Sequence, residues 1–361
     1  MALSFNFYTT GEYFDELIGS FGAAGQGDSI RLASMAFDLS EPKVIRIIEE
    51  LAAAAGRGAD VSLAIDAYAF LNRDNRLPGP LFYRNKLPAR MPKLFAARYE
   101  ALKTIERAGG RLRIINLPGR RFTNPMGGRN HIKLALINSR VFVGGCNLNS
   151  SSHLDMMVGF EQKSAAKKLA GVFDKIMAAG STEALGNTDV SFKVDAQTEI
   201  FIDSGAKKQS LIYNQAMGLL DKANRSVYMF CQYFPYGDTA RHLAAAHQRG
   251  CDITLVYNHP SKHGRLHSFG HHAIIIKERA SAPKSFFAGR LPKSTPYLHA
   301  KLIATDKAAI LGSHNFVTAG VNLGTAELAL VCKSSSFANK ALRCINRQLY
   351  GSKPQEPQPV A

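Results

Sequence analysis

The chain has 361 residues, of which 46% are hydrophobic and 20% charged, and it carries a formal net charge of +17 at pH 7. This apolar content excludes an intrinsically disordered chain, and the length allows two domains with a buried core. No apolar stretch is long enough for a transmembrane helix, and the amino terminus lacks the basic and apolar regions of a secretory signal. We therefore expect a cytoplasmic protein with no transmembrane anchor, in contact with a membrane at most peripherally.

The first half of the chain alternates predicted strands and helices. Strands are expected at 30–35 and 61–65, and the apolar spacing of residues 44–51 predicts a helix between them. The second half repeats this order, with strands at 227–230 and 253–256 and a helix between them. Such alternation favours an α/β architecture with parallel strand pairs.

Two copies of one motif follow these segments, 168 positions apart. His131 and Lys133 begin the first copy, and His299 and Lys301 begin the second. In both copies a polar residue follows the histidine by 7 positions, a glycine by 13 and an asparagine by 16; these are Asn138, Gly144 and Asn147, then Asp306, Gly312 and Asn315. One His-x-Lys occurs by chance, whereas two copies with matching offsets indicate a duplicated half-site that folding brings together.

A carboxylate at the start of an apolar strand follows each copy, Asp155 in the first half and Glu327 in the second. Helices are then expected at about 165–178 and 337–349. We therefore predict four segments along the chain: a first half over 1–180, a linker over 181–198, a second half over 199–350 and a disordered tail over 351–361.

The positive charge is concentrated ahead of the two motifs. Residues 73–133 carry a net charge of +12, and residues 262–301 carry +7. Such clusters favour an anionic partner, either phospholipid or nucleic acid, over a basic face that serves only solubility. Contact with a membrane surface could use the apolar and basic side chains of one segment: Leu81, Phe82, Tyr83, Arg84 and Lys86.

The cysteines and the remaining histidines give no sign of a metal site. The five cysteines are odd in number and lie in apolar segments, so we expect buried thiols rather than disulfides or zinc ligands. A group of histidines lacks accompanying cysteines or carboxylates, so a mobile basic loop is expected there: His259, His263, His267, His271 and His272. No metal and no cofactor are predicted.

The residue types of the paired motifs suit phosphoryl transfer at a phosphodiester. In an extended strand alternate side chains point the same way, so His131 and Lys133 share a face, as do His299 and Lys301. If the halves pack about a pseudo-two-fold axis, two imidazoles and two ammonium groups converge on one pocket. One neutral imidazole could then attack phosphorus while the other, protonated, donates to the leaving alcohol. The two ammonium groups supply positive charge, so no divalent metal is required.

The paired motifs resemble those of the phospholipase D superfamily, in which His-x-Lys is followed by Asp and by Gly-Ser-x-Asn. The likeness spans residues 7–349. Within the superfamily the chain is most similar to bacterial cardiolipin synthases, because Arg129 and Asn130 precede His131, Gly-Gly-x-Asn stands in the first copy, and Arg-Gly-x-Asp turns occur in both halves. The resemblance implies an α/β fold of two similar halves, each a mixed, largely parallel sheet flanked by helices. The halves are expected to pack about a pseudo-two-fold axis with the active site between them.

The resemblance also implies a role for each motif residue. His131 is expected to form a covalent phosphohistidine, His299 to act as general acid, and Asp155 and Glu327 to accept hydrogen bonds from the imidazoles. Phosphate is expected to be bound by the lysines and by three polar residues: Lys133, Lys301, Asn147, Asn315 and Ser313. The remaining motif residues are expected to support the loops: Asn138, Asp306, Gly144, Gly145 and Gly312.

Two residues depart from the family's pattern in the first copy, where Asn138 replaces the acid and Gly145 replaces the serine. Asparagine keeps hydrogen-bonding groups although not the charge, so a working site is expected. The resulting prediction is an enzyme of the cardiolipin synthase type that transfers or hydrolyses phosphatidyl groups of anionic phospholipid. Two alternatives stay open: a metal-independent nuclease acting on DNA or RNA, and a binder of anionic lipid or nucleic acid without turnover.

Overall fold

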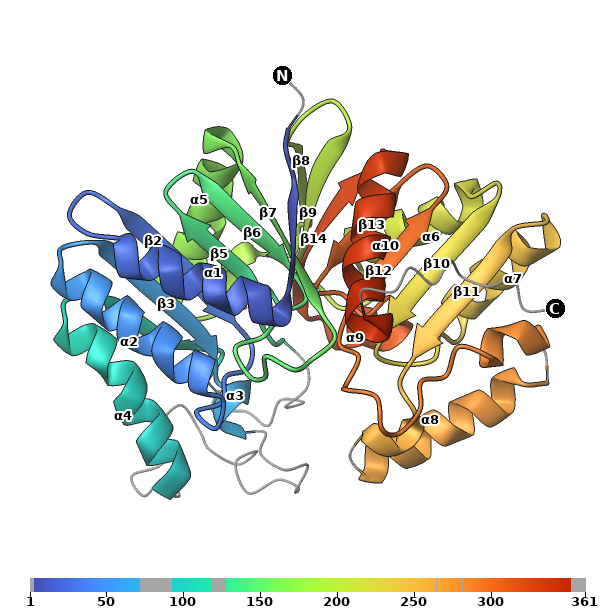
Figure 1. The fold of residues 1–361 in the computed structure, drawn as a ribbon, viewed down its shortest axis with the longest axis horizontal. Coiled ribbons are helices and arrows are strands. Elements are labelled where there is room, and N and C mark those ends of the chain that lie inside the picture. The colour runs from blue at the N-terminus through green and yellow to red at the C-terminus, as the bar shows by residue number, and fades with distance from the viewer. Residues whose placement is uncertain (1–2, 72–92, 118–127, 264, 281, 352–361) are drawn as a thin grey trace.

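A computed structural model describes residues 3–71, 93–117, 128–263, 265–280 and 282–351 of the chain. These residues form two seven-stranded sheets that lie side by side (Figure 1). The first sheet has the strand order β1 (Asn6–Thr9), β7 (Met156–Glu161), β6 (Arg140–Gly144), β5 (Leu134–Ile137), β2 (Ser29–Ser34), β3 (Asp60–Asp66) and β4 (Arg111–Ile115). The second has the order β11 (Asp252–Tyr257), β10 (Ser226–Cys231), β12 (Leu302–Thr305), β13 (Ala309–Gly312), β14 (Ala326–Cys332), β9 (Thr198–Ser204) and β8 (Val190–Lys193).

The two sheets repeat one strand order, which confirms the prediction of two similar halves. The run β1, β7, β6, β5, β2 and β3 corresponds to β9, β14, β13, β12, β10 and β11. Each sheet adds one strand of its own, β4 at the far edge of the first and β8 beside β9 in the second. The inner strands of the two sheets are also neighbours, because β14 lies against β6.

The sheets are mixed, as expected, but the expectation that they are largely parallel is wrong. Four of six neighbouring pairs in the first sheet and five of six in the second are antiparallel. Parallel pairs occur where a helix connects the strands, as α2 (Pro42–Gly56) and α7 (Asp238–Gln248) do. The connections from β5 to β6 and from β12 to β13 are short turns, which can join only antiparallel strands.

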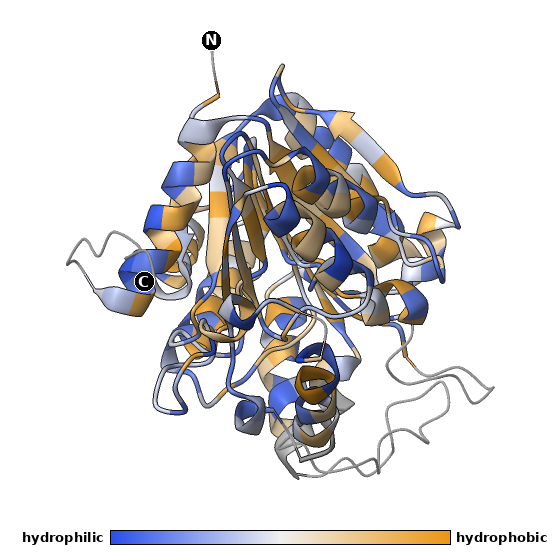
Figure 2. Ribbon diagram, turned by 90° about the vertical axis from the view of Figure 1, so that its right-hand side faces the viewer, coloured by the Kyte–Doolittle hydropathy of each residue, from blue (hydrophilic) through white to orange (hydrophobic). Residues whose placement is uncertain are grey.

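Helices cover both faces of each sheet, and one apolar core runs between the halves. The outer faces are covered by α1 (Thr10–Ala23), α2 and α4 (Lys93–Arg107) in the first half and by α6 (Leu211–Lys222) and α7 in the second. Between the sheets, α5 (Lys163–Ala179) and α10 (Ser335–Tyr350) share one buried cluster with strands of both halves. Figure 2 shows apolar residues concentrated on the strands, while the flanking helices alternate polar and apolar residues. This shared core holds the halves in a fixed relation.

The shorter helices lie in the connections: α3 (Tyr68–Leu71), η2 (Thr182–Leu185), η3 (Pro260–Lys262), α8 (Arg265–Glu278), η4 (Lys284–Phe287) and α9 (Thr318–Leu323). The segment expected as a linker, 181–198, contains η2 and also β8, which pairs with β9. The histidine-rich segment is helical, so the expectation of a loop there is wrong. Packing explains the helix, because His271 and Ile275, one helical turn apart, are both buried against the protein.

Several other expectations concern burial and order. All five cysteines are buried and unpaired, as predicted. In the part of the chain that the structure describes, no helix is long and apolar enough to cross a bilayer. The proposed membrane segment at residues 81–86 and the tail at 352–361 lie outside the described residues.

Candidate active site

The two halves meet through backbone hydrogen bonds beside each motif histidine. The amide of His131 donates to the carbonyl of Ala326 (2.8 Å), and the amide of His299 donates to the carbonyl of Leu154 (2.9 Å). Ala326 and Leu154 directly precede the two candidate carboxylates in sequence. Each histidine therefore lies beside the carboxylate of the other half.

The His-x-Lys segments lie just ahead of β5 and β12 rather than inside these strands, where they were expected. The segments end strand pairing because their backbone groups bind the opposite half instead of a neighbouring strand. Each lysine folds back on its own motif: Lys133 Nζ donates to the carbonyl of His131 (2.8 Å), and Lys301 Nζ donates to the carbonyl of His299. Lysine and histidine of one motif thus stay together at the interface.

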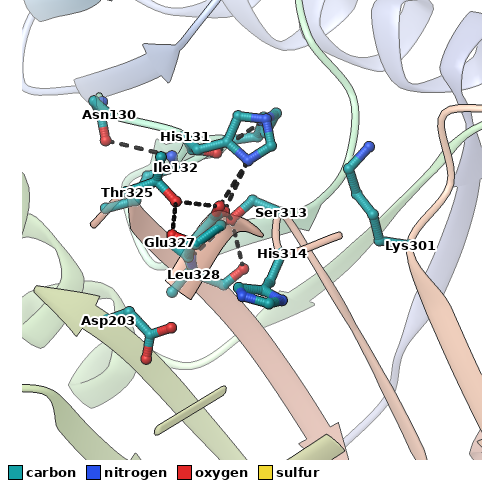
Figure 3. A network of polar contacts seen from close by, with 12 residues as sticks. Asn130, His131, Ile132, Asp203, Lys301, Ser313, His314, Thr325, Glu327 and Leu328 are labelled. Carbon is teal, nitrogen blue, oxygen red and sulfur yellow. Dashed lines mark hydrogen bonds and ion pairs between the residues drawn. The ribbon is translucent and has the colours of Figure 1, made fainter. Parts of the chain in front are cut away.

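The two histidines and the two carboxylates form reciprocal pairs across the halves. His131 Nδ1 lies 2.8 Å and 3.0 Å from the two carboxylate oxygens of Glu327. His299 Nδ1 lies 2.6 Å from Asp155 Oδ2. In Figure 3 the other ring nitrogen of His131 points away from Glu327. All four sequence-predicted groups are therefore brought to one interface, although the sequence did not predict the exchange of partners.

Both carboxylates are ionised. Burial would raise the pKa of Glu327, but the hydrogen bond from His131 and the charge of Lys133 hold that pKa well below its ordinary value. Burial likewise opposes ionisation of Asp155, yet the hydrogen bond from His299 and the charge of Lys301 keep the pKa of that carboxyl lowered. An ionised carboxylate only accepts hydrogen bonds. Each histidine therefore carries its proton on Nδ1 and, when neutral, has its lone pair on Nε2.

Burial favours the neutral form of both imidazoles in the free protein. Burial lowers the pKa of His131 to about 4, with partial compensation by Glu327. Burial and the charge of Lys301 lower the pKa of His299 to about 3, against the opposing effect of Asp155. A bound anion between the rings would favour a protonated imidazole, because opposite charges stabilise each other.

The two lysines bring positive charge into a buried place. Both are only 1% exposed. Burial and the neighbouring charge of Lys301 lower the pKa of Lys133 to about 7, and burial lowers the pKa of Lys301 to about 8. An ammonium group disfavoured by burial and by a like charge gains strongly from an anion, so the pair forms a candidate phosphate site.

The asparagines of the two motifs are buried or half-buried, each with an unused polar atom. Among the described residues, Asn147 Oδ1 and Asn315 Oδ1 are buried without a hydrogen-bond partner. Unpaired buried polar atoms are unfavourable, and an amide oxygen accepts hydrogen bonds. These two oxygens therefore suit a donor group of a ligand, such as the hydroxyl of an alcohol. The hydroxyl of Ser313, in contrast, is already engaged: it donates to Glu327 and accepts from the amide of Leu328 (2.9 Å). In the structure this hydroxyl positions Glu327, and contact of Ser313 with phosphate stays a prediction.

The motif glycines are required by close packing. A Cβ at Gly144 would lie 2.2 Å from the carbonyl oxygen of Met156, and one at Gly312 would lie 2.3 Å from that of Leu328. At Gly145 a Cβ would lie 2.3 Å from Asp155 Oδ1. The absence of a serine at this position thus makes room for the carboxylate.

Asn138 and Asp306 support turns at the far ends of β5 and β12. Asn138 has a φ of 53°, its Oδ1 accepts from the amide of Ser29 (2.9 Å), and its Nδ2 donates to Asp28 (2.8 Å). Asp306 Oδ1 accepts from the amides of Asn224 and Arg225 (3.2 and 3.3 Å). Both residues therefore tie a turn to the start of the neighbouring strand, and their hydrogen bonds do not involve the histidines.

Two further residues hold the histidines in place, and sequence reasoning missed them. Asp66 is the last residue of β3 and accepts from the amide of Asn130 (2.7 Å), while Asn258 follows β11 and accepts from the amide of Leu298 (2.9 Å). Asn130 and Leu298 directly precede the two motif histidines. Their shared place at the ends of equivalent strands was the signal that could have revealed them.

Comparisons with known proteins agree with this geometry. The family described as "Cardiolipin synthase, PLD-like domain" matches residues 18–177 and 217–349. No curated protein matches the chain. The fold is similar to the crystal structure of phosphatidylserine synthase from Haemophilus influenzae Rd KW20, with a TM-score of 0.69 at 12% identity over 97% of this chain and 88% of that one. It is also similar to polyphosphate kinase from Porphyromonas gingivalis, with a TM-score of 0.55 at 14% identity over 96% of this chain and 47% of that one.

The family match covers most of the chain and includes both His-x-Lys motifs, both carboxylates and both asparagines. The solved structures share the fold of two halves over nearly the whole chain. The chain is therefore a member of the phospholipase D superfamily, whose chemistry is phosphodiester hydrolysis or transfer, and it belongs to the family of cardiolipin synthase PLD-like domains.

Proposed function

We propose that this protein is a phosphatidyltransferase or phosphodiesterase of the cardiolipin synthase type, which acts on anionic phospholipid through a covalent phosphohistidine. The observation that carries the proposal is the reciprocal pairing of His131 with Glu327 and of His299 with Asp155. This pairing presents two Nε2 atoms from different halves at one interface. A site for in-line displacement at phosphorus needs two such groups, one to attack and one to protonate the leaving oxygen.

In the first step, Nε2 of neutral His131 attacks phosphorus and forms a P–N bond. The P–O bond to the leaving alcohol breaks, and protonated His299 donates its proton to that oxygen. Glu327 stabilises the positive charge that develops on the His131 ring, since it accepts from Nδ1. In the second step, an acceptor alcohol or water gives its proton to His299 and attacks phosphorus, and the P–N bond breaks.

The non-bridging oxygens of the phosphodiester are the natural ligands of the two lysines. Lys133 and Lys301 are buried on either side of the interface, and each lowers the pKa of a group in the other half through its charge. Their positive charge stabilises the negative charge that builds on phosphoryl oxygens. The amides of Asn147 and Asn315 offer further polar contacts. We therefore expect turnover in the presence of EDTA.

Lipid is favoured over nucleic acid as the substrate. The matching family is described as cardiolipin synthase, and the fold is shared with a phosphatidylserine synthase. The net charge of +17 would serve either anionic substrate. We propose a cytoplasmic enzyme that meets its lipid at the membrane surface.

One experiment separates these substrates. Purified protein in EDTA is incubated with phosphatidylglycerol vesicles and, separately, with labelled single- and double-stranded DNA and RNA. Cardiolipin with release of glycerol supports the synthase, and phosphatidic acid with the release of glycerol supports the hydrolase. Cleaved nucleic acid with intact lipid would replace the proposal by a nuclease, and loss of activity in EDTA would refute the metal-independent mechanism.

The remaining alternative is a protein that binds anionic lipid or nucleic acid without turnover. Asn138 is the only residue that suggested it. The hydrogen bonds of Asn138 lie at the turn beyond β5 and involve Ser29 and Asp28. Asparagine supplies these bonds without a charge, so the turn is held as Asp306 holds its counterpart. We expect Asn138→Asp to change kcat/KM by less than about threefold. A much larger gain would show that the asparagine had impaired the site.

A further inference from the structure

Helix α8 (Arg265–Glu278) carries the two most exposed large apolar side chains of the described residues. Phe269 is 77% exposed and Ile276 is 69% exposed. Residues seven positions apart lie on the same side of a helix, and the exposed residues His272 and Ala273 lie between them on that side. The α8 apolar stripe, defined as Phe269, Ala273 and Ile276, therefore faces outward.

The opposite side of the same helix packs into the protein. His271 is 3% exposed and Ile275 is 4% exposed, and His271 Nε2 accepts from the amide of Phe234 (2.7 Å). The helix is thus anchored by its inner face, and its outer apolar residues are not needed for the core. An apolar stripe that contributes nothing to folding indicates an interaction surface.

Basic side chains lie near the stripe, beside His272 of the same helix, whose ring lies 6.3 Å from that of His259. Lys277 follows it directly and is exposed, and Arg290 and Lys293 are exposed in the segment after η4. Their charges act together, because burial and then Arg290 and Lys293 lower the pKa of His259, which precedes η3. Residues 262–301 include only one acid, Glu278. Exposed apolar side chains beside basic ones are complementary to an anionic phospholipid surface.

The stripe lies at the same end of the second sheet as the active site. Helix α8 begins seven residues after Asn258, which holds the residue before His299. In Figure 1 the helix extends below the second sheet. A chain of contacts joins its inner face to the site: the ring of His271 lies 4.9 Å from that of His263, and His263 Nδ1 lies 3.2 Å from the hydroxyl of Tyr297, whose ring lies 6.3 Å from that of His299.

We infer that α8 docks the protein on anionic phospholipid bilayers, with Phe269 and Ile276 inserted among the acyl chains and the neighbouring lysines and arginine on the headgroups. The inference names the membrane-contacting element and rests on the proposed lipid substrate. A nucleic acid is a less suitable partner, because single-stranded bases stack on aromatic side chains, and the stripe has one aromatic ring beside two aliphatic residues. Docking here brings phosphodiester headgroups to the edge of the sheet where the histidines lie.

The absence of tryptophan from the chain permits a direct test. A Phe269→Trp variant would carry the only tryptophan, and Ile45→Trp on the outer helix α2, where Ile45 is 40% exposed, is the matched control. With vesicles of equal parts phosphatidylglycerol and phosphatidylcholine, emission of the Phe269→Trp variant should shift to the blue and be quenched by brominated acyl chains. The Ile45→Trp variant should show neither change.

A second measurement compares vesicle binding with and without the apolar side chains of the stripe. The double variant Phe269→Ser, Ile276→Ser should sediment with these vesicles at least about tenfold more weakly than the parent protein. Its turnover of a soluble short-chain phosphodiester should stay within twofold, which shows that the variant is folded. Equal sedimentation of variant and parent would overturn the inference. So would a parent dimer that the double variant dissociates in ultracentrifugation, because the stripe would then be covered by a second copy.

The two measurements do not depend on lipid turnover. If the parent protein fails to convert phosphatidylglycerol but the stripe still controls sedimentation, the proposed function is lost while the docking surface stands. If turnover occurs and the stripe has no effect on vesicle binding, the docking surface is wrong and the function stands.

Discussion

The two halves of the molecule position the same chemical groups with different residues. In the first half Asp155 occupies the space in which a side chain at position 145 would lie, so Gly145 is required there. In the second half the longer Glu327 accepts a hydrogen bond from Ser313 and another from Thr325 (2.9 Å). Carboxylate length and the residue after the motif glycine are therefore coupled. A short acid accompanies glycine, and a long acid accompanies serine.

The two halves also use different residues for one purpose at the ends of their strands. Asp66 and Asn258 hold equivalent backbone amides, and so do Asn138 and Asp306, with acid and amide exchanged between the halves in each case. The hydrogen bond is kept while the charge is not. Asp66 uses its charge for a second contact, a buried ion pair with Arg129 (3.2 Å). The histidines and lysines, in contrast, occur unchanged in both halves.

The largest effect is expected at the residues that do not differ between the halves. His131→Asn and His299→Asn should each lower kcat/KM by about 10⁴-fold or more, because each step needs both imidazoles. His242→Asn is the matched control, since His242 Nδ1 lies 2.6 Å from Asp221 on the surface in a similar pair. Steady-state assays on one phosphodiester check all three. Retention of activity within tenfold in either motif variant would show that the halves do not act together.

The next effect distinguishes the two carboxylates. Glu327→Gln and Asp155→Asn should each lower kcat by about 10² to 10⁴-fold, because each acid fixes the tautomer of its histidine and stabilises its charge. A p-nitrophenyl phosphodiester, whose leaving group needs no proton, should restore most of the activity of Asp155→Asn and little of that of Glu327→Gln. The opposite pattern would exchange the roles of His131 and His299.

A moderate effect is expected where the halves differ most. Gly145→Ser should lower activity by about 10 to 100-fold, since the new side chain would displace Asp155; overpacking of this kind costs roughly 1–3 kcal/mol. Adding Asp155→Glu should recover part of the loss, because it reproduces the combination found in the second half. Kinetic assays and chemical denaturation of both variants check this. An active single variant with unchanged stability would disprove the coupling.

The smallest effect concerns pH. The pKa of Lys133 is lowered to about 7 and that of Lys301 to about 8, so both lose charge as pH rises through this range. An anion binds the charged form, so binding above pH 8 requires uptake of protons and the affinity should fall by about tenfold per pH unit for each proton taken up. Titration calorimetry with tungstate between pH 6 and 9 measures this, and Lys133→Met should flatten the slope. A constant affinity over this range would contradict a role for the lysines in anion binding.

The paired motifs allowed much of the site to be predicted from sequence, because repeated offsets require no knowledge of the fold. His131, His299, Asp155 and Glu327 do meet at one interface. The exchange of carboxylates between the halves could not be predicted, since offsets along the chain do not show which half faces which. The contact of Ser313 with Glu327 was not predicted for a related reason, because it depends on the length of the Glu327 side chain.

The fold was predicted in outline but not in strand direction. The alternation of strands and helices correctly predicted the parallel pairs around α2 and α7. The hairpins after each motif contain no helix, and they add antiparallel strands to each sheet. The helix α8 was missed because its outward side is apolar as well, which removes the alternation that reveals a surface helix. Asp66 and Asn258 belong to no motif, so only the equivalence of their strands identifies them.

The central claim, that imidazoles from both halves act on one phosphorus atom, is tested most directly by trapping the covalent intermediate. Protein is mixed with labelled phosphodiester, quenched in alkali, which preserves phosphohistidine, and analysed by peptide mass spectrometry. The mechanism predicts a label on His131 that accumulates in the second-step-deficient His299→Asn variant when a p-nitrophenyl substrate is used, and no label in His131→Asn. A label that persists in His131→Asn, or separate labels on both histidines in the parent protein, would contradict it.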